Sequence, residues 1–139
     1  MARDHRKLRV FTDAHRITLA ICRCTNEFPR DEWFGLRAQL RRAAISVATN
    51  IVEGSARRTG KEYCNFLNIA LGSAAELTYL VRLSFELGLI GGAMFTEIGS
   101  ACEQLNAQLQ ALVNSVESLN AASRSRSRTA RSTPNTPKV

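Results

Sequence analysis

Residues 98–119, IGSACEQLNAQLQALVNSVESL, carry the most regular apolar pattern of this 139-residue chain. Apolar residues recur there in alternating steps of four and three, at Ile98, Cys102, Leu105, Leu109, Leu112, Val116 and Leu119. Such spacing lines one face of an α-helix with apolar side chains. The strict alternation is also typical of helices that pack at a shallow angle, as in a coiled coil. The stretch therefore predicts a long helix that packs lengthwise against other helices.

Two further helices are predicted in the first half of the chain from the same periodicity. The first covers about residues 13–27 and ends before Pro29, whose ring cannot continue a helix. The second covers about residues 31–54 and stops at Gly54, a residue that commonly ends helices.

The remaining predicted helix begins at a capping box formed by Thr59 and Glu62, and it closes near Gly88. Two adjoining apolar stripes run along it, which indicates that it contacts more than one neighbour. No segment has a convincing strand pattern, and the three connections are short. The sequence therefore predicts an all-α fold, an up-down four-helix bundle.

Charge and composition divide the chain into a bundle over residues 1–121 and a tail over 122–139. The tail is basic, contains proline and has few apolar residues, so we expect it to be disordered. Residues 1–61 carry +7, residues 62–121 carry −5, and the tail carries +5, for a net charge of +7. No apolar run approaches the ~18 residues of a membrane helix, and the charged N-terminus does not resemble a signal peptide, so we expect a cytoplasmic protein with no membrane partner.

Nothing in the sequence points to catalysis, a metal or a cofactor. Cys22, Cys24, Cys64 and Cys102 form no C-x-x-C or Cys/His cluster, and we interpret them as small packing residues. Glu-x-x-His pairs of di-iron bundles and G-x-S-x-G motifs are both absent from the sequence. We therefore expect a protein that is not an enzyme.

A row of polar residues follows one side of the second predicted helix. Arg42, Ser46, Asn50 and Glu53 recur there at steps of four, four and three, and the third helix presents Ser73 and Glu76. If the two rows face each other, Arg42 or Asn50 pairs with Glu76, and Ser73 bonds across. Buried charges persist only when they are paired and hydrogen-bonded. The row predicts a buried polar network or an interface, with ligand contact as the alternative.

Basic residues form the candidate nucleic-acid site. The segment EGSARRTGKE, residues 53–62, resembles a P-loop but lacks its spacing, its Ser or Thr and a preceding strand. Its cations lie near the start of the third helix, and two arginines share a face of the second. The residues predicted to contact a nucleic-acid backbone are Arg37, Arg41, Arg57, Arg58 and Lys61. The alternative is a solvated basic surface. Trp33 is interpreted as covering the end of the bundle or a subunit contact.

Several short motifs occur in an order that resembles a known family. They are FP (28–29), EWFGL (32–36), QLRRAAISV (39–47), NIVEG (50–54), KEY (61–63), FLNIALGS (66–73) and EL (76–77). Together they resemble the bacterial four-helix-bundle proteins encoded in intervening sequences of 23S ribosomal RNA genes. The resemblance covers about residues 8–90. Cys22 stands where the family usually has tyrosine, and the fourth helix and the tail lie outside the motifs.

The resemblance implies a four-helix bundle that assembles as a ring-shaped homopentamer. The fold is also similar to that of retroelement accessory variability determinants, pentamers that bind a reverse transcriptase and nucleic acid. The family-like polar and small positions are Gln39, Arg41, Arg42, Ser46, Asn50, Glu53, Gly72, Ser73 and Glu76. The resemblance implies a structural or subunit-interface role for them, and it implies that Gly72 permits close helix approach.

Two hypotheses for function follow. The first is a homo-oligomer, expected to be a pentamer, whose basic surface binds RNA or DNA, with the arginine-rich tail as an auxiliary contact. The second is an oligomeric scaffold for a protein partner, contacted through apolar residues such as Trp33. Salt separates them, because nucleic-acid affinity falls steeply with salt. A small-ligand or enzymatic role at Asn50, Glu53 and Glu76 is a third alternative.

Overall fold

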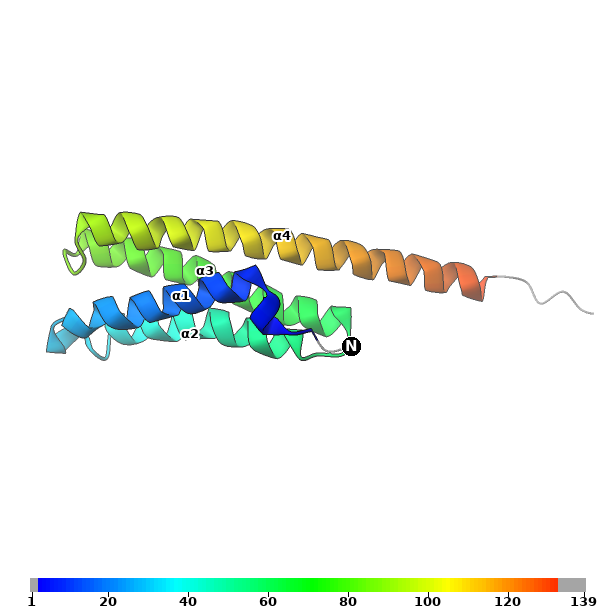
Figure 1. Cartoon of the computed structure of the whole chain (residues 1–139), viewed down its shortest axis with the longest axis horizontal. Helices are drawn as coiled ribbons and strands as arrows, with labels where there is room; N and C mark the ends of the chain where they lie inside the picture. The colour runs from blue at the N-terminus through cyan, green and yellow to red at the C-terminus, as the bar shows by residue number, and fades with distance from the viewer. Residues whose placement is uncertain (1–2, 133–139) are drawn as a thin grey trace, which may run out of the picture.

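A computed structural model describes residues 3–132 of the chain, and α-helices make up most of this part. The helices are α1 (Arg9–Cys24), α2 (Leu36–Ser55), α3 (Gly60–Glu86) and α4 (Gly92–Arg131). Short 3₁₀ turns occupy His5–Lys7, Thr25–Glu27 and Arg30–Glu32. The described residues contain no strand, and successive helices run up and down (Figure 1). The predicted all-α four-helix architecture is confirmed.

Local signals explain where α3 begins and ends. The Thr59 side chain accepts a hydrogen bond from the Glu62 backbone N–H at 3.2 Å, which caps the helix start as predicted. At the other end, Gly88 has φ +75°, a conformation that side chains disfavour. The Leu89 N–H bonds to the Ser84 carbonyl, and the Gly88 N–H bonds to the Phe85 carbonyl, both at 2.9 Å. These two bonds form a Schellman motif, which satisfies carbonyls that the helix end would otherwise leave unpaired.

The first two helices differ from their predicted bounds. Helix α1 starts at Arg9, earlier than the predicted residue 13, because Val10 already contributes to the core. It ends at Cys24, where Thr25–Glu27 tighten into a 3₁₀ turn. Helix α2 starts at Leu36, later than predicted, because Arg30–Glu32 form a separate 3₁₀ turn. Such tightened turns are common at helix ends and in connectors.

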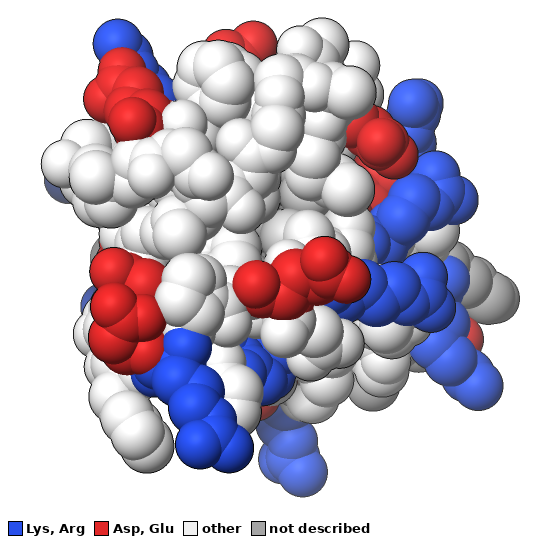
Figure 2. All heavy atoms as spheres, turned by 90° about the vertical axis from the view of Figure 1, so that its left-hand side faces the viewer, with Lys and Arg blue, Asp and Glu red and all other residues white. Residues whose placement is uncertain are grey.

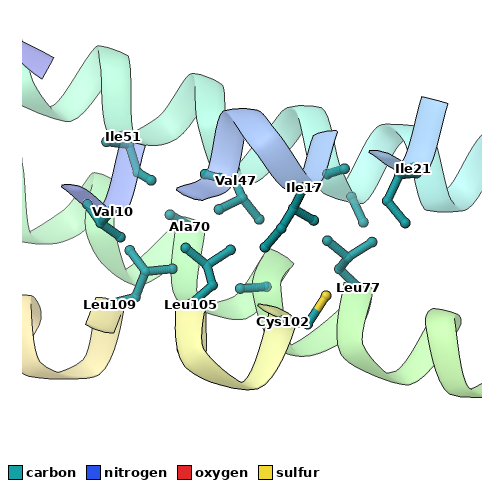
Figure 3. Close-up of a cluster of buried hydrophobic side chains, with 14 of the residues drawn as sticks. Val10, Ile17, Ile21, Val47, Ile51, Ala70, Leu77, Cys102, Leu105 and Leu109 are labelled. Atoms are coloured by element: carbon teal, nitrogen blue, oxygen red, sulfur yellow. The ribbon is translucent and has the colours of Figure 1, made fainter. Parts of the chain in front are cut away.

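One apolar core runs between the four helices (Figure 3). Ile17, Val47, Leu77 and Leu105 each come from a different helix, and all are at least 95% buried. In α4 the buried positions are Ile98, Cys102, Leu105, Leu109, Val113 and Val116. The predicted position Leu112 is half-buried and packs against the core beside the fully buried Val113, whereas the predicted position Leu119 is 70% exposed. A straight α-helix has 3.6 residues per turn, so its buried face drifts away from a strict seven-residue repeat.

Helix α4 is longer than the predicted bundle. It passes residue 121 and continues to Arg131, whereas the sequence predicted a disordered tail from residue 122. Figure 1 shows this part of α4 projecting beyond the turn between α2 and α3. Its side chains from Ala121 to Ser132 are all exposed, so backbone hydrogen bonds rather than packing form it. The predicted tail residues 133–139 lie outside the described residues. Within residues 3–132, none of the helices combines the length and apolarity required to cross a bilayer.

Candidate nucleic-acid interface

The turn between α2 and α3 carries three exposed cations, Arg57, Arg58 and Lys61. The turn is held close to the bundle at Gly54, where an added Cβ would lie 2.8 Å from the Phe66 Cβ. Only glycine therefore fits at this crossing of α2 and α3 without a shift of backbone. Two local features fix the position of these cations: α2 ends just after its close contact with α3 at Gly54, and α3 begins at the Thr59 cap.

The N-terminal arm adds a fourth cation to this turn. The Arg3 guanidinium donates a hydrogen bond to the Arg57 carbonyl at 3.1 Å and lies 4.2 Å from the centre of the Tyr63 ring. The Arg57 guanidinium lies 4.7 Å from the centre of the Phe66 ring. These cation–π contacts orient the two guanidinium groups along the surface without neutralising them. Arg3 was not predicted for this site, because no local pattern in the sequence shows that the arm returns to the turn.

The projecting part of α4 lies beside the same turn. Gly60, at the start of α3, faces α4, since a Cβ there would come within 2.1 Å of the Asn120 Oδ1. Beyond Asn120 the helix leaves the bundle and carries Arg124, Arg126, Arg128 and Arg131, all exposed. No acidic residue follows Glu117 in the sequence. One end of the molecule therefore collects cations from three separate segments. We call it the basic end: Arg3, Arg57, Arg58, Lys61, Arg124, Arg126, Arg128 and Arg131.

The cations of the basic end are largely uncompensated. The ion pairs found within residues 3–132 are Arg6–Asp4, Arg9–Asp13, Arg42–Glu76 and Arg82–Glu86. None of them includes a residue of the basic end. Figure 2 shows the opposite end of the molecule, where basic and acidic groups both lie among uncharged side chains. The two ends therefore differ, with mixed charges at one and a cluster of cations at the other.

Two predicted contact residues do not belong to this end. Arg37 and Arg41 lie in the first turns of α2, and a 20-residue helix is about 30 Å long. The Arg41 guanidinium donates to the Cys22 carbonyl at 2.9 Å, to the Thr25 hydroxyl at 2.9 Å and to the Asn26 side-chain carbonyl at 2.8 Å. Arg41 therefore closes the end of α1. The five predicted contact residues therefore do not gather on one surface in this chain.

Arg37 is also engaged within the chain. Its guanidinium lies 4.8 Å from the centre of the Trp33 ring, and the Arg30 guanidinium lies 5.4 Å from it. Trp33 is 38% exposed, and its indole N–H donates to the Phe28 carbonyl at 3.1 Å. The predicted role of Trp33 at the end of the bundle fits this placement. The neighbouring Phe34 is far more accessible, at 94%.

The structure brings most of the polar row together across α2 and α3. Arg42 pairs with Glu76 and also donates to Gln39 at 3.1 Å. The Ser46 and Ser73 hydroxyls lie 2.8 Å apart, and the Asn50 side chain donates to the Ser46 carbonyl at 2.8 Å.

Within the single chain this row is only partly buried, and its predicted interface role stays a prediction. The side chains of Arg42 and Glu76 are 53% and 40% exposed, so the row lies at the surface edge of the α2–α3 contact. Glu53 is exposed, and no hydrogen bond or ion pair joins it to the row. Gly72 makes no close helix approach within the chain, because a Cβ there meets nothing within 4 Å. Gly72 points outward from α3, and Gly54 makes the close approach instead.

Burial makes three of the four thiols, those of Cys24, Cys64 and Cys102, poorly suited to nucleophilic chemistry. Burial raises the pKa of Cys102 to about 12, and burial likewise raises the pKa of Cys24 and of Cys64. The thiolate is the reactive form of cysteine, so these groups stay in the less reactive state at neutral pH. No group of three or more His, Cys, Asp or Glu side chains gathers to hold a metal ion within residues 3–132.

The fold and the site define a class of protein: an all-helical bundle with a cluster of exposed arginines at one end. The chain belongs to the 23S rRNA-intervening sequence protein family, whose sequence pattern it matches over residues 6–111. A crystal structure from Bacteroides thetaiotaomicron, described as a protein of unknown function from the S23 ribosomal protein family, has a similar fold. Its TM-score is 0.70 at 22% identity, over 76% of this chain and 95% of that one. No curated protein matches the chain.

Proposed function

We propose that this protein binds the sugar-phosphate backbone of a nucleic acid through its basic end. The observation that supports this most directly is the gathering of exposed, unpaired cations from the α2–α3 turn and from the projecting part of α4. Arg37 and Arg41 are not part of this proposal, because they lie in the first turns of α2, away from the basic end, and Arg41 also donates its hydrogen bonds to the end of α1. The proposed contacts are Arg57, Arg58 and Lys61, joined by the four arginines of α4.

The shape of the basic end favours a polymer over a small anion. The projecting segment from Ala121 to Arg131 is about 15 Å long, at 1.5 Å per residue, and the turn adds cations at its base. Cations spread over such a length match a row of phosphates and release counterions when a polyanion binds. Arginine suits this role, because its planar group donates to phosphate oxygens in pairs. The proposed activity is binding without catalysis, in the cytoplasm.

Charge variants test the location of the site. The variant Arg57→Gln/Arg58→Gln/Lys61→Gln removes three cations from the basic end, and Arg16→Gln/Arg23→Gln/Arg30→Gln removes three exposed cations elsewhere. We expect the first to bind labelled RNA and DNA at least about tenfold more weakly, equivalent to ~1.4 kcal/mol. The matched control should stay near wild type. Equal losses in both variants would contradict a localised site, and circular dichroism checks that both remain helical.

We propose further that the chain assembles as a homopentameric ring, as the family resemblance implies. Support comes from apolar side chains on the outer faces of α2 and α3. Ile45, Ile69 and Tyr79 are 46%, 52% and 62% exposed. Contact with other copies would remove these apolar side chains from water, which favours association.

A protein partner is the second candidate function. The observation that favours it is Phe34, which is 94% exposed next to Trp33 at the end opposite the basic one. A partner bound there would be held by apolar contact, so its binding would survive high salt and would be lost in Phe34→Ser. Nucleic-acid binding at the basic end would instead weaken at high salt and persist in Phe34→Ser.

A further inference from the structure

The projecting segment of α4 has cations on two opposite sides. Successive residues of an α-helix are rotated by about 100°. On that basis Arg124, Arg128 and Arg131 fall within about 60° of one another, and Arg126 lies on the reverse side. A helix that rests on a flat anionic surface can use only one of these sides. Cations on both sides suit a site in which phosphates flank the helix, as the two walls of a nucleic-acid groove do.

Apart from its arginines, the segment carries only small side chains. Between its arginines stand only alanine, serine and threonine, from Ala121 to Ala130. Every side chain in it is exposed, so no other element blocks its approach to a partner (Figure 1). The major groove of B-form DNA is about 12 Å wide and admits an α-helix. The major groove of A-form RNA is deep and narrow, so side chains cannot read it.

Single-stranded nucleic acid is a poorer match. Proteins that bind single strands stack the bases on aromatic side chains. The sequence has no aromatic residue after Phe95, so the projecting segment offers no such platform. In the α2–α3 turn, the rings of Tyr63 and Phe66 are already covered by Arg3 and Arg57.

We propose that the projecting segment of α4 lies in the major groove of B-form duplex DNA. This inference rests on the proposed nucleic-acid function and names its substrate. Arg124, Arg128 and Arg131 contact the phosphates of one wall, and Arg126 contacts the other. The segment's length of about 15 Å spans four to five base pairs at roughly 3.4 Å each. Arg57, Arg58 and Lys61, at the base of the segment, contact phosphates that flank the groove.

The first test compares three labelled probes of equal length and equal salt: duplex DNA, duplex RNA and single-stranded DNA. We expect the full-length protein to bind duplex DNA at least about tenfold more tightly than either of the others, equivalent to ~1.4 kcal/mol. Equal binding to all three probes would overturn the groove placement while leaving backbone binding at the basic end intact. Tighter binding to duplex RNA would also overturn it. No binding to any probe would overturn the proposed function as well.

The second test keeps every charge and changes only the helix. Ser127→Pro breaks the projecting segment, because proline removes a helical hydrogen bond and clashes with the preceding turn. The segment contacts no part of the core, so the bundle should stay folded. Ser127→Ala, which keeps the backbone N–H and the helix, is the matched control. We expect Ser127→Pro to lose the preference for duplex DNA and Ser127→Ala to keep it. A Ser127→Pro variant that keeps the preference would contradict the proposal.

Discussion

Arg41 and Arg42 are adjacent residues of the same type, and the fold uses them differently. Arg41 donates three hydrogen bonds to the end of α1, where Thr25 is fully buried. Arg42 forms a half-exposed pair with Glu76. Exposed ion pairs contribute about 0–1 kcal/mol, whereas loss of a partner to buried polar groups costs about 1–3 kcal/mol. The contribution of each arginine to stability therefore depends on the groups that it reaches.

This difference gives a prediction at the level of single residues. Arg41→Ala should lower the free energy of unfolding by about 1–3 kcal/mol, because the Thr25 hydroxyl and the Cys22 carbonyl lose a partner. Arg42→Ala should lower it by less than about 1 kcal/mol. Urea denaturation followed by circular dichroism measures both. A larger loss in Arg42→Ala than in Arg41→Ala would contradict the roles assigned to these two residues.

The sequence could identify candidate residues but not their partners. The polar row was visible from its spacing, and Arg42–Glu76 and Ser46–Ser73 do meet. Whether that row is buried depends on the rotation of α2 and α3 about their own axes. Apolar spacing does not determine that rotation precisely. Arg41 was misread for a related reason. Its partners come from α1, and the 3₁₀ turn that presents Thr25 was expected to be helix.

At the scale of elements, the contact between α2 and α3 depends on one glycine. At Gly54 a Cβ would lie 2.8 Å from the Phe66 Cβ and 3.2 Å from the Tyr63 ring. Gly72, in the middle of α3, faces open space. The two positions therefore form a natural pair for substitution, since the same methyl group is added in both cases.

Gly54→Ala should destabilise the protein by about 1–3 kcal/mol, because the new methyl group pushes α2 and α3 apart. Gly72→Ala should stabilise it by about 0.5–1 kcal/mol, because alanine restricts the unfolded chain and favours helix. Thermal and urea unfolding measure both effects. If Gly72→Ala is as damaging as Gly54→Ala, then another copy packs closely against Gly72 on the outer face of α3, and the prediction for Gly72 is wrong.

The beginnings and ends of helices were predictable where local chemistry sets them. Thr59 caps α3 and Gly88 closes it, as their residue types indicated. The length of α4 was not predictable from apolar spacing, because residues beyond 121 have no buried face. Arginine and alanine favour helix on their own, and this preference carries α4 to Arg131.

At the scale of the molecule, the fold turns an uneven charge distribution along the chain into two unlike ends. The turn cations and the arginines of α4 are more than 60 residues apart in sequence, yet the up-down order of the helices brings them to one end. The other end mixes basic with acidic side chains and exposes Phe34. The family pattern ends at residue 111, so the arginines of α4 lie outside it.

Assembly is a second property of the whole molecule. If the chain forms the proposed ring, light scattering on the purified protein should give five times the chain mass of 15.4 kDa. Ile69→Glu/Tyr79→Glu should then reduce the mass, because charges on the outer face of α3 would be buried between copies. A wild-type mass equal to one chain would contradict the ring, while nucleic-acid binding could still be tested on the monomer.

The dependence of nucleic-acid affinity on salt tests the central claim most directly. We would titrate labelled duplex DNA with the full-length protein at several salt concentrations, beside Arg57→Gln/Arg58→Gln/Lys61→Gln and the matched control. A plot of log K against log salt should be linear and steep, and each lost phosphate contact should reduce its slope by about 0.9. The basic-end variant should therefore show a shallower slope than the wild type and the control. Affinity that is absent at low salt, or that does not change with salt, would contradict the account.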